Sequence, residues 1–320
     1  MKTTPWPRAV AIALAGSAIL AVVVLAFLWP SVTSKVAHVP VAVVGDSAAV
    51  SSQLSETFDI SSAPDRATAV EQIQSREVYG AIVLGQTPEV LTASANGTVV
   101  SQMFTGVASG LGTTATDIVP LASTDARGAG LSAMGFPLVI GGIVGGVLIS
   151  TTIKGTWRRL LATAVYGVGA GIVVVLIAQS WFGILQGSVL PDMAAVTMSV
   201  LAVTALIVGL TSIIGPAGIA VGSVLMMFVG NQISGATQPW QFLPEPWGAI
   251  GQFFPQGAGA TLLRELSYFP AASTTQAWLV LAAWVAVGAA FMLVGHKRVR
   301  VETTSEVRAS SATEPERVAL

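Results

Sequence analysis

Long apolar runs alternate with polar segments along the chain, and six of the runs are candidates for membrane-spanning helices. They cover residues 9–29, 131–151, 160–182, 193–213, 219–233 and 277–295. A helix needs about 20 apolar residues to cross the hydrocarbon core of a bilayer, and only the run at 219–233 is clearly shorter. The pattern predicts an α-helical polytopic membrane protein with six transmembrane helices.

The first run, at residues 9–29, could be a signal peptide or a permanent anchor. It is longer than the roughly 7 to 15 apolar residues of a signal peptide, and it ends in Phe27-Leu28-Trp29-Pro30 rather than in a small-residue cleavage site. We therefore expect it to remain as transmembrane helix 1, preceded by a short cytoplasmic segment at residues 1–8.

Residues 31–130 are more polar and alternate β-rich runs with helical ones, which predicts a small extracytoplasmic α/β domain between helices one and two. Extended runs lie at 40–44, 81–84, 90–95 and 118–121, and helical spacing at 48–58, 65–79 and 99–111. Asp65 is placed to cap the second of these helices. About 100 residues can bury one modest core.

The segment 234–275 is rich in proline, glycine and aromatic residues, which places it at the outer membrane interface. We expect a short helix between Pro244 and Pro255, and a second helix at 257–269 that lies flat at the level of the lipid headgroups. The segment is either an outer gate for a substrate or a packed cap. The candidate residues are Trp247, Phe253, Phe254, Arg264 and Glu265.

Glycines are concentrated in the second and third predicted spans. Small residues four apart let two helices approach closely, where lipid offers no hydrophobic drive for association. Glycine is also common in membrane helices generally. The candidates for helix packing, against another span or against a second copy of the chain, are Gly141, Gly142, Gly145, Gly146, Gly167 and Gly171.

The distribution of Lys and Arg near the span ends predicts the orientation. With the N-terminus inside, the cytoplasmic side holds Lys2, Arg8, Lys154, Arg158, Arg159, Lys297, Arg298, Arg300 and Arg308. The outer side holds only Lys35, Arg127 and Arg264 near membrane ends. Since cytoplasmic loops carry the excess of cations, both termini are expected in the cytoplasm, the C-terminal one as a disordered tail at residues 296–320.

The composition and the motifs of the chain limit the kinds of binding and catalysis that it can perform. The chain is 53% hydrophobic and only 10% charged, and its net charge of −1 gives no indication of a nucleic-acid partner. It has no cysteine, and His38 and His296 lie far apart, so we expect no metal site. The sequence contains no phosphate loop, zincin motif or nucleophile elbow, and we expect neither catalytic residues nor a cofactor.

The connection between the second and third spans, Thr151 to Arg159, is the best candidate for contact with a partner. Lys154, Trp157, Arg158 and Arg159 could dock on an acidic, apolar-lined groove, although the cations could equally be topological markers. All six predicted spans lack ionisable residues, which argues against an ion-coupled carrier. Energy for active transport would therefore enter through the cytoplasmic turns.

One amino-terminal span, an outer α/β domain and five further spans resemble the phage-infection-protein-like (Pip/YhgE) membrane proteins of the type-2 ABC permease superfamily. The similar stretches are Val41 to Asp46, Glu77 to Leu84, Asp125 to Leu131 leading into Pro137, and Pro255 to Arg264. The resemblance implies a homodimeric permease body in the bacterial plasma membrane, surrounded by lipid. It also implies that the 151–159 connection is a coupling helix that meets a separate cytoplasmic ATPase.

Two functions follow from these expectations. The first is an ABC-type export permease subunit for a lipid, peptide or drug-like molecule. The alternative is a non-transporting membrane scaffold or receptor for cell-surface assembly, secretion or phage attachment. Co-purification with an ATPase would distinguish them.

Overall fold

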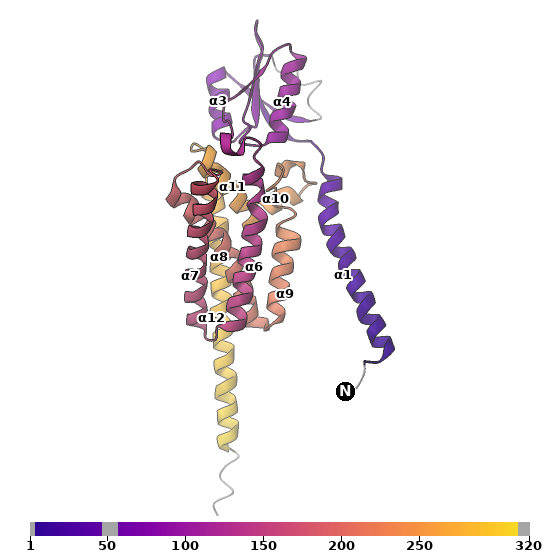
Figure 1. The fold of residues 1–320 in the computed structure, drawn as a ribbon, viewed down its shortest axis with the longest axis vertical. Coiled ribbons are helices and arrows are strands. Elements are labelled where there is room, and N and C mark those ends of the chain that lie inside the picture. The colour runs from indigo at the N-terminus through magenta and orange to yellow at the C-terminus, as the bar shows by residue number, and fades with distance from the viewer. Residues whose placement is uncertain (1–3, 47–56, 313–320) are drawn as a thin grey trace, which may run out of the picture.

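The computed structural model describes residues 4–46 and 57–312, and consists of a helical bundle with a small α/β domain at one end (Figure 1). Among these residues, five helical segments are long and apolar enough to cross a membrane. They are Trp6–Pro30, Ala129–Thr152, Thr156–Trp181, Val189–Ile214 and Thr275–Gly295. The remaining expected span, at 219–233, corresponds to the shorter apolar helix Ala217–Gly230.

The bundle is built around α8 (Val189–Ile214), whose middle is buried on nearly all sides. It is surrounded by α6 (Gly135–Thr152), α7 (Thr156–Val175), α9 (Ala217–Val224) and α12 (Thr275–Ala312). The short α5 (Ala129–Ala133) leads into α6, and π-helical turns follow α7 at Leu176–Trp181 and α9 at Leu225–Gly230. α12 continues through Ala312, where disorder was expected from residue 296.

Helix α1 (Trp6–Thr33) stands apart from the bundle along most of its length (Figure 1). The most apolar part of its spanning segment is not buried within the protein. It meets the rest of the chain at its domain end, where Phe27 lies edge-on to Phe228 at 5.9 Å and Trp29 edge-on to Trp247 at 6.1 Å. The apolar surface of α1 is therefore left uncovered by the rest of the chain.

The α/β domain contains one five-stranded sheet of order β2-β1-β3-β4-β5. The strands are β1 (Val39–Val44), β2 (Phe58–Ala63), β3 (Gly80–Val83), β4 (Glu89–Thr92) and β5 (Ala115–Asp117), and only the β3–β4 pair is antiparallel. α4 (Thr98–Gly110) covers one face and α3 (Arg66–Gln74) the other. Side chains alternate along β1, so that Val41 and Val43 face α4 while Ala42 faces α3.

The domain differs from the sequence prediction at several element boundaries. Asp65 caps α3 as expected, by accepting a hydrogen bond from the Thr68 amide at 2.8 Å. The helix expected at 65–79 ends at Gln74, and the last strand lies at 115–117 rather than 118–121. The helix expected at 48–58 falls mostly outside the described residues, while Phe58 itself begins strand β2.

The segment 234–275 forms a short turn at Trp240–Phe242, then α10 (Trp247–Gly251) and α11 (Pro255–Tyr268). The second helix was expected to lie exposed at the surface, flat at the level of the headgroups, but it is largely buried. α11 is buried between the bundle and the domain because Leu262 and Leu263 pack into the bundle core, while Phe269 packs into the domain core. Gly259 allows this close approach, since a Cβ there would lie 2.6 Å from the Ser199 hydroxyl.

Candidate binding site between the domain and the bundle

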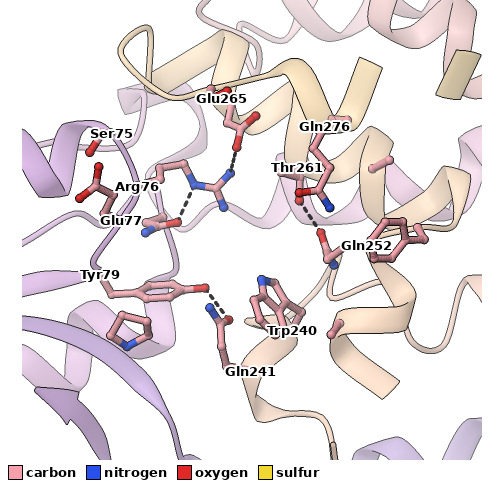
Figure 2. Close-up of a pocket in the computed structure, with 17 residues that line it drawn as sticks. Ser75, Arg76, Glu77, Tyr79, Trp240, Gln241, Gln252, Thr261, Glu265 and Gln276 are labelled. Carbon is pink, nitrogen blue, oxygen red and sulfur yellow. Dashed lines mark hydrogen bonds and ion pairs between the residues drawn. The ribbon is translucent and has the colours of Figure 1, made fainter. Parts of the chain in front are cut away.

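A cavity of about 540 Å³ lies where the α/β domain meets α10, α11 and the start of α12 (Figure 2). We call it the interface cavity. Its domain wall includes Arg76, Glu77, Tyr79 and Asn96, which follow α3 or β4. Its other wall comes from residues of the membrane region, Trp240, Gln241, Gln252, Phe253, Thr261, Glu265, Ser273 and Gln276 among them. The cavity therefore exists only when the two parts of the chain are joined.

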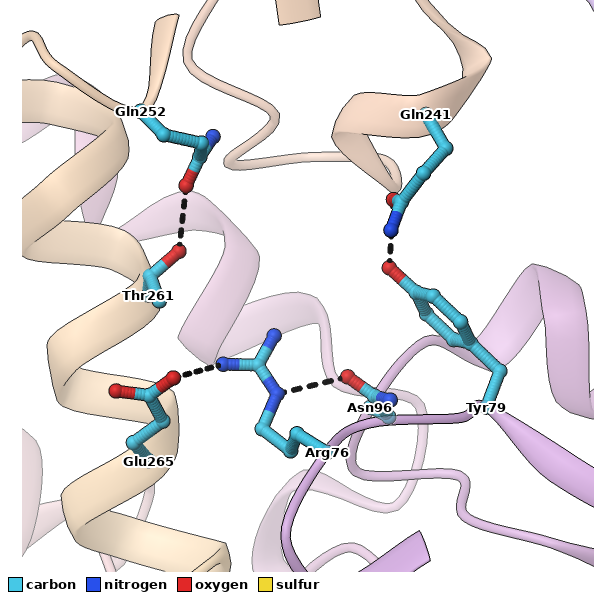
Figure 3. A network of polar contacts seen from close by, with 7 residues as sticks. All are labelled: Arg76, Tyr79, Asn96, Gln241, Gln252, Thr261 and Glu265. Carbon is cyan, nitrogen blue, oxygen red and sulfur yellow. Dashed lines mark hydrogen bonds and ion pairs between the residues drawn. The ribbon is translucent and has the colours of Figure 1, made fainter. Parts of the chain in front are cut away.

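Arg76 is the central group of the domain wall. It lies just beyond the end of α3 with φ at 61°, a left-handed conformation that non-glycine residues adopt at a cost of roughly 1–2 kcal/mol. Its Nε donates to Asn96 Oδ1 at 3.0 Å and its Nη1 donates to Glu265 Oε1 at 3.0 Å (Figure 3). The guanidinium also lies 5.5 Å from the centre of the Phe269 ring. This strained position aims the side chain at α11.

Two neighbouring charges on α11 are shielded from water. Burial raises the pKa of Glu265, although the charge of Arg76 acts to lower it. Burial lowers the pKa of Arg264 to about 10, and the nearby positive charge of Arg76 acts in the same direction. Glu265 Oε2 and Arg264 Nε are buried without a hydrogen-bond partner among the described residues. The charged groups around the cavity thus keep unused hydrogen-bonding capacity.

Neutral polar groups complete the walls. The Tyr79 hydroxyl donates to Gln241 Oε1 at 2.9 Å, which forms a second connection between the domain and the membrane region. The Thr261 hydroxyl donates to Gln252 Oε1 at 2.8 Å, and Gln252 Nε2 donates to the Ser234 carbonyl at 2.9 Å. Figures 2 and 3 show these side chains converging from separate elements on one space. Such convergence of polar groups in a concave site is typical of ligand binding.

The predicted outer-cap residues separate into two groups. Phe253 and Glu265 line the interface cavity, and Arg264 lies next to it on α11. Trp247 instead contacts Trp29 of α1, and Phe254 packs against Trp284 at 5.7 Å. Sequence reasoning missed Arg76 and Tyr79, because nothing local marks a residue after a helix end as part of a site formed with α11.

The predicted partner-contact residues lie at the opposite end of the bundle. α6 ends at Thr152 and α7 begins at Thr156, so the expected turn of residues 151–159 is a three-residue linker at 153–155, with no separate coupling helix. Lys154 and Arg158 are exposed, as is 73% of Trp157. Gly155 makes the tight linker possible with φ at 92°.

Arg159 has a different role from its neighbours. Its Nε donates to the Ile153 carbonyl at 2.8 Å, its Nη2 to the Ser150 carbonyl at 3.1 Å, and its Nη1 to the Ser212 hydroxyl at 3.1 Å. These bonds cap the last carbonyls of α6 and join them to α8. Arg159 therefore fixes the linker to the central helix instead of offering its charge to a partner.

Five of the six candidate glycines pack against helices of the same chain. A Cβ on Gly142 would lie 2.6 Å from Val203 Cβ, and one on Gly146 would lie 2.8 Å from Ile207. Added methyl groups at the other three would overlap neighbouring side chains, Gly145 with Tyr166, Gly167 with Leu201 and Gly171 with Thr197. Gly141 has space, since a Cβ added there would lie 4.0 Å from the Tyr166 hydroxyl, the nearest group to it. These glycines thus serve packing within one chain.

Asp192 is an ionisable residue that the sequence prediction placed just outside the fourth span. α8 begins at Val189, so the helix includes Asp192, whose side chain is fully buried. Neither carboxylate oxygen has a hydrogen-bond partner among the described residues. The argument that all spans lack ionisable residues does not hold for this helix as it is built.

Comparison of the chain with known protein families, with curated proteins and with solved structures yields no match. The family resemblance read from the sequence therefore stays a hypothesis. A functional proposal has to be based on the geometry at the two ends of the bundle.

Proposed function

We propose that this chain is the membrane-spanning subunit of an ABC-type exporter, working with a separate ATPase to move a lipid, peptide or drug-like molecule across the membrane. The observation that carries the proposal is the position of α8. At one end Arg159 ties α8 to the exposed cluster of Lys154, Trp157 and Arg158. At the other end α8 packs against α11, which holds Glu265 in the interface cavity.

A closely packed helix of this kind can transmit displacement, because protein interiors are dense and poorly compressible. An ATPase bound at the exposed cluster would move the linker, and Arg159 would pass that movement to α8. α11 would then shift against the domain, where the Arg76–Glu265 pair and the Tyr79–Gln241 hydrogen bond are the connections to be rearranged. In this proposal the exposed cluster faces the cytoplasm and the domain faces outward.

Purification of the complex from native membranes tests the proposal. The wild-type chain should co-purify with an ATPase, and Trp157→Ala combined with Arg158→Glu should release it, since like charges at an interface cost several kcal/mol. Arg127→Glu, an exposed charge reversal at the domain end, should retain it. Cytoplasmic cations also direct topology, so each variant is made in a chain that also carries Gln102→Cys on the α/β domain. Labelling of that cysteine by an impermeant maleimide in intact cells establishes that the domain still faces outward. Retention of the ATPase by a correctly oriented double variant would contradict the coupling role.

A non-transporting scaffold or receptor is the second candidate. The linker at residues 153–155 favours it, because a linker this short presents no helix of its own to an ATPase. Absence of any co-purifying ATPase with the wild-type chain would decide for this function.

A further inference from the structure

We propose that the interface cavity binds a neutral, hydroxyl-rich ligand, either a soluble sugar or the sugar headgroup of a glycolipid. This inference does not require an ATPase and holds for an exporter or for a receptor. It rests on three properties of the cavity, namely its balance of charge, its supply of hydrogen-bonding groups and its exposed aromatic rings.

The charges around the cavity are balanced. Among the lining residues Arg76 is positive and Glu77 and Glu265 are negative. Arg264 does not line the cavity, but it lies close enough to interact with Arg76 and Glu265, and its positive charge brings the sum to zero. Arg76 and Glu265 are already paired at 3.0 Å, with 13% and 10% of their side chains exposed. A charged ligand would have to separate this shielded pair or leave its own charge unbalanced, and breaking a buried pair is costly. The cavity therefore favours a ligand without net charge.

The hydrogen-bonding groups suit hydroxyls, which both donate and accept. Tyr79, Thr261, Gln241 and Gln252 each combine donor and acceptor capacity. Glu265 also lines the cavity and adds the acceptor capacity of a carboxylate. Arg76 uses Nε and Nη1 in its two hydrogen bonds, which leaves Nη2 to donate to the same kind of group. A sugar presents many hydroxyls around one ring and can satisfy several of these groups together.

Aromatic rings at the cavity provide an apolar surface. Trp240 is 37% exposed and Phe253 is 59% exposed, and both line the cavity. A sugar ring has an apolar C–H face beside its hydroxyl edges, so it can pack on such rings while its hydroxyls reach the polar wall. Nearby, the Trp29–Trp247 pair forms an aromatic contact of the kind found at membrane interfaces. In the proposed orientation this pair lies at the level of the membrane where a glycolipid headgroup is found.

The volume of about 540 Å³ lies within the range of roughly 300–1,000 Å³ that is usual for small-molecule sites. The cavity is thus large enough for a sugar of one or two rings. Its walls come from both parts of the chain, so the occupied site would hold the domain against α11.

A protection experiment on the full chain tests this assignment. Because the protein has no cysteine, Gln276→Cys at the cavity rim can be labelled with a maleimide without background, and Gln102→Cys on α4 is the matched exposed control. The chain should be placed in phosphatidylcholine nanodiscs and freed of sugar-based detergent. The probes are maltose, glucosyl-diacylglycerol added to the nanodisc, inorganic phosphate and choline.

A bound ligand should slow labelling at position 276 about tenfold when present at ten times its Kd, and should leave position 102 unchanged. Protection by maltose supports a soluble sugar, and protection by glucosyl-diacylglycerol alone supports a lipid headgroup. Equal protection by phosphate or choline, or protection by none of the probes, would overturn the proposal.

Two variants of matched shape assign the ligand to the polar wall. Gln241→Met and Thr261→Val remove hydrogen-bonding groups with little change in volume, and Gln102→Met is the control. In the Gln276→Cys background the first two should abolish protection and the control should retain it. Melting temperatures establish whether each variant is folded. If a wall variant does not fold, the protection experiment on the chain with only Gln276→Cys decides the proposal. Full protection in both folded wall variants would contradict the assignment.

Discussion

Arg76 donates a hydrogen bond from Nη1 to Glu265 Oε1 at 3.0 Å and so joins two residues 189 positions apart in the sequence. Arg76 belongs to the α/β domain and Glu265 to α11, the buried helix at the domain end of the bundle. Both side chains are largely shielded from water. The pair is therefore both a connection between two parts of the protein and a wall of the interface cavity.

The first prediction concerns the energy of this pair. Arg76→Met and Glu265→Gln should each lower the free energy of unfolding, because each leaves a shielded charge without its partner. The double variant should be more stable than the sum of the two losses predicts, with a coupling of about 1–3 kcal/mol. Chemical unfolding of the purified chain measures it. Additive losses would show that the two side chains do not interact energetically, and the exposed Arg66–Glu89 pair should give a smaller coupling.

The second prediction separates two adjacent glycines of α6. Gly145→Ala should destabilise the chain by roughly 1–3 kcal/mol, because the added methyl group would overlap the Tyr166 ring in a packed interior. Gly141→Ala is the matched control, since the added methyl group would lie 4.0 Å from its nearest neighbour. Thermal unfolding compares the two, with size measured by light scattering. A change in oligomeric mass without a change in stability would instead place Gly145 at a contact between copies.

Local patterns in the sequence predict many of the elements and fail where distant residues decide. Asp65 could be identified as a helix cap because its partner lies three residues away. The apolar runs at 131–151 and 277–295 correspond to spanning helices because length and composition are local properties. By contrast, α11 carries Arg264 and Glu265 among apolar residues, and this amphipathic pattern fits a surface helix equally well.

The site itself could be predicted only in part. Glu265 and Phe253 attract notice as a charge and an aromatic residue at a membrane interface. Arg76 and Tyr79 do not stand out in the sequence. Their contacts with Glu265 and Gln241 depend on how the domain packs on the bundle. Likewise, nothing local shows that Arg159 caps α6 while Arg158 remains exposed.

The third prediction uses acid to distinguish two carboxylates. The hydrogen bond from Arg66 lowers the pKa of Glu89 below 4.5, so its stabilising contribution is present above pH 4.5 and is lost as the pH falls through the folded-state pKa. Burial raises the pKa of Glu265, so its contribution has the opposite sign and decreases as the pH rises through its folded-state pKa. The hydrogen-exchange protection of α3 and β4, corrected for the intrinsic pH dependence of amide exchange, should decrease between about pH 5 and pH 3.

Glu89→Gln should flatten the acid-side loss of protection in α3 and β4, because the neutral amide does not titrate. Glu265→Gln should leave that loss in place and alter the pH dependence only above 4.5, the usual value for a glutamate. Identical profiles for wild type and Glu89→Gln would remove Glu89 as the cause.

The fourth prediction concerns the buried carboxylate of α8. Asp192→Asn should raise the free energy of unfolding by on the order of 1 kcal/mol, because the substitution removes a buried charge that has no hydrogen-bond partner. Asp125→Asn is the control with the opposite expectation. The buried Asp125 carboxylate accepts from the Gly130 and Leu131 amides at 3.0 and 2.9 Å, so its loss should destabilise the start of the second span.

Thermal unfolding at neutral pH compares the two variants. A stability loss in Asp192→Asn as large as that in Asp125→Asn would mean that the Asp192 carboxylate is satisfied by a group from outside the chain, such as a bound cation or water.

The walls of the interface cavity come from residues between Pro40 and Ala277. During synthesis the ribosome completes the α/β domain while the helices that will support it do not yet exist. Arg76 and Tyr79 are therefore in place on the sheet before α10 and α11 have been translated. The last residues of the cavity wall are translated with the first turn of α12. A nascent chain can thus acquire its domain early, but it acquires the site only when its final spanning helix begins to form.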